Sequence, residues 1–183
     1  MQWAGATAAV LMAVTSMSTS ASAQSLRDFG QADGWQVKQL DDDACVMMKY
    51  LGGTEDSTLV FYRFEPGDAV EMNVSILTAM AVPDRNAVDW GALEPLPLYY
   101  AVSSGGTFGQ TYEVEGYLGH EYVDPSHIRQ IFTIDLDAPA LDRIAGADVV
   151  GLATDAEHAE RFQLGRATRA VAIARRCERQ LRR

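Results

Sequence analysis

The chain has 183 residues, of which 48% are apolar, and it carries 15 lysines and arginines against 25 aspartates and glutamates. So many apolar residues exclude a disordered chain, because such a chain lacks the side chains to form a core. The net charge of −10 argues against nucleic acid as a partner, since an acidic surface repels phosphates.

The first 23 residues have the features of a secretory signal peptide rather than of a cytosolic tail rich in alanine and serine. Residues 4–14 form an apolar run that is too short to span a bilayer, and Ala21 and Ala23 provide the small side chains that signal peptidase requires. The start of this segment has no lysine or arginine, so either the start amine alone supplies the positive charge or the true start lies upstream. We therefore expect an exported bacterial protein, periplasmic or secreted, with no transmembrane segment in the mature chain.

Residues 24–33 are polar and contain glycine, which predicts a flexible lead-in, and a single β-rich domain is expected over residues 34–183. In residues 69–77, Val70, Met72 and Val74 alternate with polar residues, so one face of this strand should be buried. Short strands that follow one another in this way predict an antiparallel sheet. The expected strands are residues 34–39, 44–51, 57–64, 69–77, 98–102, 110–118 and 127–136.

Residues 81–97 break the strand pattern with three prolines and the isolated Trp90. This composition predicts a long loop. Such a loop either carries a binding function or forms a lid over one end of the core, with Trp90 as its apolar plug. We expect the lid, and Trp90 is also a candidate binding residue.

The C-terminal part predicts helices. Asp137 is expected to cap a short helix that ends at residue 145, with Pro139 in its first turn. A hairpin of residues 148–153 and 160–164 should follow, and then a helix over residues 166–182. Apolar residues of this last helix recur at spacings of three and four, which predicts one narrow buried stripe. The stripe consists of Ala167, Ala170, Val171, Ala174, Cys177 and Leu181.

Cys45 and Cys177 are the only two cysteines. In an exported protein they are expected to form a disulfide, and Cys177 on the apolar stripe faces the sheet, as a bridge to a strand requires. The alternative is two separate buried thiols. A catalytic thiolate is disfavoured because residues 41–43 are three aspartates. The predicted fold class is α+β, an antiparallel meander with a C-terminal helix packed on it and linked to it by the disulfide.

Charge is distributed unevenly along the chain. Residues 24–154 carry 7 basic and 21 acidic side chains, whereas residues 155–183 carry 8 basic and 4 acidic side chains. The basic end is either a docking surface for an anionic partner or a solvated helix face that neutralises the acidic body. Arg175, Arg176 and Arg179 are the candidate docking residues.

Residues 119–127 contain the side chains most typical of chemistry. The candidate metal ligands are His120, Glu121, Asp124 and His127. The two histidines are seven residues apart, which neither helix nor strand geometry brings together, so only a loop would assemble them. Solvated turn residues are the alternative.

Other catalytic patterns are incomplete. Ser103 and Ser104 precede two glycines but lack the frame of a nucleophile elbow, which indicates a tight turn. Glu113 and Glu115 alternate on the wet face of a predicted strand. No residue is assigned as catalytic, and no cofactor is expected.

The two ends of the chain resemble those of a known family. Trp35 begins the first predicted strand of the domain, and Phe162-Gln163-Leu164-Gly165 leads into an alanine-rich helix. This layout resembles the small exported proteins of the invasion-associated locus B family. The position of Cys45, ten residues after Trp35, departs from that family, as does the lack of its central cysteine pair. The resemblance implies an exported β-rich module with a host or envelope role, and an uncharacterised exported family fits as well.

The sequence thus predicts a non-catalytic exported protein that binds or scaffolds in the envelope and has a protein or another envelope component as its partner. The alternative is a hydrolase or metal-dependent enzyme that uses the loop from His120 to His127.

Overall fold

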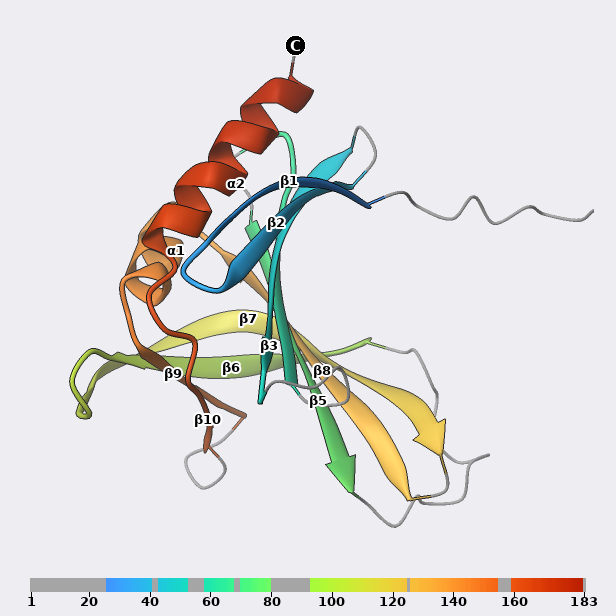
Figure 1. Ribbon diagram of the computed structural model, residues 1–183. Helices are drawn as coiled ribbons and strands as arrows, with labels where there is room; N and C mark the ends of the chain where they lie inside the picture. Colours follow the sequence, from blue (N-terminus) through green and yellow to red (C-terminus); the bar gives the residue numbers. More distant parts are fainter. Residues whose placement is uncertain are drawn as a thin grey trace, which may run out of the picture.

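The computed structural model describes residues 26–40, 43–52, 58–67, 70–79, 93–124, 126–154 and 159–182. These residues form one antiparallel sheet and two helices (Figure 1). The strands are β1 (Leu26–Ala32), β2 (Trp35–Leu40), β3 (Ala44–Leu51), β4 (Thr58–Phe64), β5 (Val70–Ala79), β6 (Leu93–Ser103), β7 (Phe108–Asp124), β8 (His127–Leu136), β9 (Val149–Ala153) and β10 (Ala159–Phe162). The helices are α1 (Ala138–Ala145) and α2 (Thr168–Leu181).

The order of strands in the sheet is β1-β2-β3-β4-β5-β8-β7-β6-β9-β10. The first five strands form a meander, and the order then reverses because β5 pairs with β8 rather than with β6. Within the described residues, β1 and β10 are therefore the two edges of the sheet. The predicted antiparallel sheet with a C-terminal helix is confirmed.

Alternating side chains place the core on one face of the sheet. On β5, Val70, Met72 and Val74 are buried, as their alternation predicts. The ring of Trp35 meets the ring of Tyr62 edge to face, with centroids 5.5 Å apart, and neither ring has any significant exposure. Trp35 Nε1 and the Tyr62 hydroxyl find no hydrogen-bond partner among the described residues. Burial raises the pKa of Tyr62 far above its usual value, so this phenol stays neutral.

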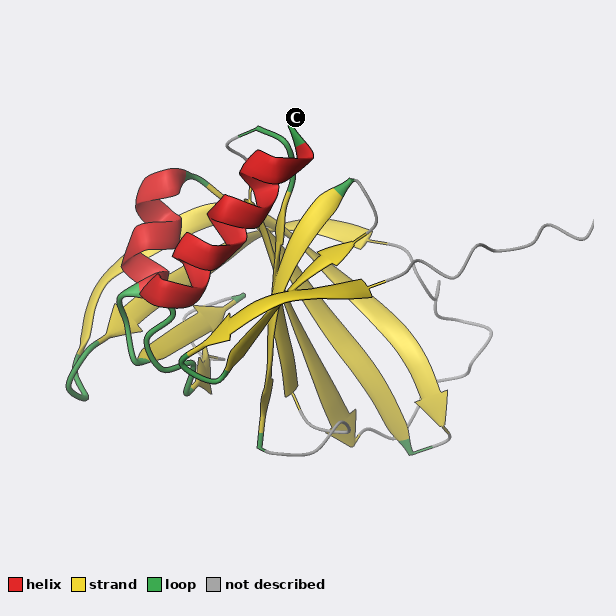
Figure 2. Ribbon diagram, turned by 45° about the horizontal axis from the view of Figure 1, so that its top comes forward, coloured by secondary structure: helices red, strands yellow, loops and turns green. Residues whose placement is uncertain are grey.

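Helix α2 covers β1 to β4 on this core face, and Figure 2 shows both helices on one side of the sheet. Ala170, Ala174 and Cys177 of the predicted stripe have no exposed surface. The small alanines let the helix approach the sheet closely. Cys45 on β3 and Cys177 on α2 form the predicted disulfide, with their Cα atoms 6.1 Å apart. The helix was predicted over residues 166–182 and extends from Thr168 to Leu181.

Helix α1 has the predicted cap. The Asp137 carboxylate accepts a hydrogen bond of 2.7 Å from the backbone N–H of Ala140, and Pro139 lies in the first turn. Arg143 of this helix donates to the Tyr100 hydroxyl through Nε at 3.1 Å and Nη2 at 2.8 Å. In the part of the chain that the structure describes, no helix has the length and apolarity needed to cross a membrane.

The prediction of a flexible lead-in over residues 24–33 is wrong for most of that segment, because Leu26–Ala32 forms strand β1. The strand pairs with β2 through a turn at Asp33 and Gly34, whose φ angles of 55° and 80° are both positive. Asp-Gly is a preferred sequence for such a hairpin turn, since both residues tolerate the left-handed region. The polar sequence of β1 does not predict a strand by itself, and the segment is a strand because the turn brings it alongside β2.

The predicted loop over residues 81–97 is also partly wrong, because β6 begins at Leu93. Pro95 and Pro97 lie within β6 and pair in register with β7, whereas β9 pairs only with the later part, from Tyr99 onward. Proline lacks the N–H that a second neighbour would need, so it fits the half of β6 that has β7 as its only neighbour among the described strands. Residues 81–92 of the expected lid, Trp90 among them, lie outside the described residues, as do the signal peptide and Asp41 and Asp42.

Candidate functional site

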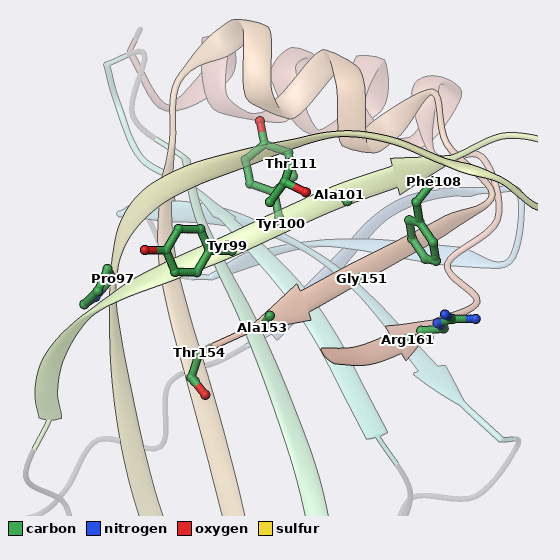
Figure 3. Close-up of a pocket in the computed structure, with 10 residues that line it drawn as sticks. All are labelled: Pro97, Tyr99, Tyr100, Ala101, Phe108, Thr111, Gly151, Ala153, Thr154 and Arg161. Atoms are coloured by element: carbon green, nitrogen blue, oxygen red, sulfur yellow. The ribbon is translucent and has the colours of Figure 1, made fainter. Parts of the chain in front are cut away.

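A groove lies on the face of β6, β9 and β10 that points away from the core (Figure 3). Its volume is about 650 Å³, which is within the range of small-molecule sites. The described residues that line it are Pro97, Tyr99, Tyr100, Ala101, Phe108, Thr111, Gly151, Ala153, Thr154 and Arg161.

The floor of the groove is low because small residues meet across neighbouring strands. Ala101 on β6 is in register with Gly151 on β9, and Ala153 is in register with Tyr99 one step away. Side chains two residues apart share a face, so Ala101, Gly151 and Ala153 form a continuous surface without bulk. The register of the sheet therefore makes the depression.

The same register aligns the sides of the groove. Thr111 on β7 faces Ala101, and Arg161 on β10 faces Gly151, so one row crosses four strands in the order Thr111, Ala101, Gly151 and Arg161. Strands are spaced by about 4.8 Å, which places the Arg161 backbone roughly 10 Å from Ala101. The row crosses the floor from β7 to β10.

Phe108 forms the wall at one end. Its ring lies against Gly151 so closely that a Cβ atom at position 151 would stand 3.2 Å from Phe108 Cε1. The Arg161 guanidinium carbon lies 5.1 Å from the centre of the same ring, within the range of a cation–π contact. Figure 3 shows Phe108 and Arg161 side by side at this end of the groove.

A tight turn fixes Phe108. The Ser103 hydroxyl oxygen accepts a hydrogen bond of 3.1 Å from the backbone N–H of Gly106, and Gly105 and Gly106 have φ angles of 112° and 99°. Glycine is needed at such angles because a Cβ would clash with the backbone. The Ser103–Gly106 segment is thus the predicted turn, and Phe108, the first residue of β7, follows it and lines the groove.

Tyr99 stands at the opposite end, with Pro97 beyond it (Figure 3). Behind this wall, on the core side, Tyr100 stacks on Tyr112 with ring centroids 5.1 Å apart. The Arg143 guanidinium carbon lies 4.3 Å from the centre of the Tyr112 ring, in addition to its hydrogen bonds to Tyr100. These contacts join β6 and β7 to α1 on the core side of the sheet.

The charge of the groove differs from that of the chain as a whole. Acidic residues outnumber basic ones by 25 to 15, yet Arg161 is the one charged residue among the described residues of the lining. Glu113 is the neighbour of Tyr99 on β7, at the end farthest from β10. The groove is therefore apolar in its middle and polarised along its length, with its positive end at Arg161.

The histidine segment is not the loop that the sequence predicts. His120 and Glu121 belong to β7, where they pair in register with Gln130 and Arg129 of β8, and Asp124 and His127 flank a tight turn. Hydrophobic alternation fades in this segment, but strand pairing extends through it. Adjacent strand residues point to opposite faces, so His120 and Glu121 diverge.

One pair of the four candidate ligands does come together. His127 Nδ1 lies 2.9 Å from Asp124 Oδ2, and the backbone N–H of Ser126 also donates to the Asp124 carboxylate. These hydrogen bonds, that of Ser126 first, lower the pKa of Asp124. Glu121 instead lies 3.9 Å from Arg129. Across the described residues, no group of three or more histidine, cysteine, aspartate or glutamate side chains could hold a metal ion.

Glu113 and Glu115, predicted on a wet face, are exposed on β7. They line a smaller hollow of about 330 Å³ together with Asp135 and Asp137. Arg143 also lines this hollow. The hollow is thus acidic, in contrast to the groove.

The candidate arginines of α2 contact side chains of their own chain. Arg175 lies 3.3 Å from Glu178 and over the ring of Phe64, and Arg176 lies over the ring of Phe29. Arg179 is exposed. Glu178 also forms an ion pair with Arg182. Nη2 of Arg182 donates a hydrogen bond of 2.8 Å to the carbonyl oxygen of Gly67. The ion pairs of Arg175 and Arg182 thus stay within α2 and its C-cap residue, whereas Arg169 of the same helix pairs with Asp33 in the turn between β1 and β2.

Comparison of the chain with known protein families, curated proteins and solved structures gives no match. The groove residues were not predicted as a site, because Tyr99, Ala101 and Gly151 look like ordinary outward-facing strand positions. The available signal was the run of small residues, Gly151 and Ala153, in a strand where bulky side chains are usual.

Proposed function

We propose that this protein is an exported, non-catalytic binding module and that the groove over β6, β9 and β10 is its ligand site. The observation that carries the proposal is the floor of Ala101, Gly151 and Ala153 between two aromatic walls. Strand positions of this kind normally carry bulky side chains. Because these three residues are small, a concave apolar groove with a volume of about 650 Å³ remains.

The strand pairing and the buried core face beneath the groove support binding. Its three strands are held by a backbone ladder, and the core face of β6 and β9 is anchored by buried Leu98, Tyr100 and Leu152. A preformed site loses little conformational entropy when its ligand binds.

The disulfide supports export. Both cysteines are without exposed surface and their bond joins elements 132 residues apart in sequence. Disulfides of this structural kind persist in oxidising compartments such as the bacterial periplasm. Together with the predicted signal peptide, the disulfide favours an envelope or secreted location.

The test is a fragment screen on ¹⁵N-labelled protein purified with its disulfide intact. Fragments that bind the groove should shift the backbone amide signals of β6, β9 and β10. The substitution Ala101→Phe should abolish these shifts, because its ring fills the floor from an outward-facing position and does not enter the core.

The matched control is Gln36→Phe, which adds the same ring at an exposed position on β2, at the other end of the sheet. It should leave binding unchanged. If no fragment shifts the groove signals, or if Ala101→Phe binds every hit as well as the unmodified protein, the groove is not a ligand site.

A further inference from the structure

We infer that the ligand of the groove is a small flat molecule with a single negative charge, of the aromatic carboxylate class. This inference rests on the proposed binding function and adds the chemistry of the ligand to it. It follows from the shape of the floor, the character of the walls and the position of the one cation.

The floor selects a flat molecule. Between Tyr99 and Phe108, the residues Ala101, Gly151 and Ala153 raise no side chain higher than a methyl group. A planar ring can lie on such a surface with contact over its whole face, whereas a branched molecule would touch it at few points. The roughly 10 Å between Ala101 and Arg161 matches a molecule of one or two rings.

The walls select an aromatic molecule. Tyr99 and Phe108 are both half-buried, so each offers part of its ring to the groove. Aromatic rings associate in offset-stacked or edge-to-face arrangements that aliphatic chains do not make. The phenol of Tyr99 adds one hydrogen-bonding group at the end opposite Arg161.

Arg161 selects an anion. Arg161 lines the groove and its guanidinium carbon lies 5.1 Å from the centre of the Phe108 ring, so a planar fork of N–H donors lies at the end of the groove that Phe108 forms. A planar carboxylate accepts two parallel hydrogen bonds from such a fork. Phe108 already covers Gly151, so the ligand ring rests on Ala101 and Ala153 beside the Phe108 ring, with its carboxylate toward β10.

The acidic body of the protein limits the charge of the ligand. A chain with a net charge of −10 repels multiply charged anions, so phosphates and polyanions are disfavoured. Glu113 beside Tyr99 adds local repulsion at the far end. A mostly apolar molecule with one negative charge at one end fits this field.

The experiment measures the affinity of four probes by titration calorimetry and by amide shifts in β6, β9 and β10. The probes are naphthoate, its neutral amide naphthamide, the cation naphthylmethylammonium and the aliphatic anion dodecanoate. Naphthoate should bind most tightly. Added salt should weaken naphthoate binding and leave naphthamide binding unchanged, because only the former includes a charge pair near the surface.

The substitution Arg161→Gln should weaken naphthoate binding roughly tenfold or more, the usual effect of losing hydrogen bonds to a charged group. It should leave naphthamide affinity unchanged. A merely structural role of Arg161 would weaken both probes. Arg161→Lys keeps the charge but not the fork, so it should give an intermediate affinity, and it serves if the Gln variant does not fold.

The outcomes separate the two proposals. If naphthamide, dodecanoate or the cation binds the groove as tightly as naphthoate, the ligand class is wrong and the binding function stands. Equal loss of naphthoate and naphthamide in Arg161→Gln would also overturn the ligand class. If none of the probes shifts the groove signals, and the fragment screen is equally blank, both proposals fail.

Discussion

The two faces of β6 and β9 share one backbone and differ in the size of their side chains. On the core face, Leu98, Tyr100, Val150 and Leu152 are at most 2% exposed and belong to the hydrophobic core. On the opposite face, Ala101, Gly151 and Ala153 leave the groove. Bulk on the first face stabilises the fold, whereas the lack of bulk on the second makes a site. Substitutions on the two faces should therefore have separable effects on stability and binding.

The largest effect is expected from the disulfide that joins the core face to α2. The double substitution Cys45→Ala and Cys177→Ala should lower the free energy of unfolding by about 2–5 kcal/mol, because the unfolded chain loses a constraint on a loop of 132 residues. Urea unfolding measures this change.

The folded double variant should keep the affinity of the groove, since Cys45 lies on β3, five strands from β6 in the sheet order, and Cys177 lies on α2, which packs on β1 to β4. A loss of groove binding under conditions in which the variant is folded would show that the two regions are coupled.

The next effect concerns Gly116 on β7. A Cβ atom there would lie 2.3 Å from Leu98 Cδ1 and 2.8 Å from the Thr133 carbonyl oxygen. Gly116→Ala should therefore cost about 1–3 kcal/mol through overpacking of the core face. Thermal and urea unfolding measure the loss.

Gly109→Ala on the same strand is the matched control. Its Cβ atom meets only the Val102 carbonyl oxygen at 3.8 Å, an ordinary contact. Equal destabilisation by the two substitutions would contradict the close packing assigned to Gly116.

A smaller effect on stability, with a larger one on binding, is expected at Gly151. Gly151→Ala brings a Cβ atom to 3.2 Å from the Phe108 ring and displaces that wall. The affinity for naphthoate should fall, while the free energy of unfolding should change by less than about 1 kcal/mol, because alanine suits a strand slightly better than glycine does. Calorimetric titration and urea unfolding on the same sample test both parts. Unchanged affinity with a displaced ring would remove Phe108 from the site.

The smallest effect is a pH dependence at the rim of the core. Arg169 Nε donates to Asp33 at 3.1 Å, and this hydrogen bond lowers the pKa of Asp33 below its ordinary value of 3.8. A carboxyl group with a lowered pKa in the folded state stabilises the protein above pH 3.8, and this stabilisation is lost as the pH falls through the folded value.

Arg169→Ala should accordingly shift the urea midpoint slightly at pH 7, and the difference from the unmodified protein should shrink below pH 3.8. The control is Arg179→Ala, which removes an exposed arginine from the same helix. A difference that grows on acidification would reverse the assigned sign.

Local rules predicted most of the sheet and both helices. Alternation in residues 69–77, the cap at Asp137 and the apolar stripe that contains Cys177 each depend on neighbours within a few residues, and the structure confirms them. The failures share a different cause. Strand β1 and the first half of β6 are not apolar or periodic enough to be recognised, and they are strands because a neighbouring strand pairs with them.

The candidate site was beyond sequence reasoning for a related reason. His120 and His127 were candidate metal ligands because histidine commonly binds metals. In the hairpin, however, His127 contacts Asp124, and His120 is in register with Gln130 of β8. The groove consists of small and aromatic residues that carry no such signal. Whether a small residue on a strand lines a groove depends on the size of the side chains on the neighbouring strands.

The sequence by itself determined the antiparallel sheet, the C-terminal helix and the disulfide, because periodicity, capping and thiol pairing depend on the identity and spacing of residues. Only the tertiary structure decided that β9 lies beside β6, so that Ala101 meets Gly151 and Arg161 reaches Phe108. Strand order and register depend on contacts between residues about 50 positions apart, and at that range the physical reason lies in the packing of the whole sheet rather than in any local pattern.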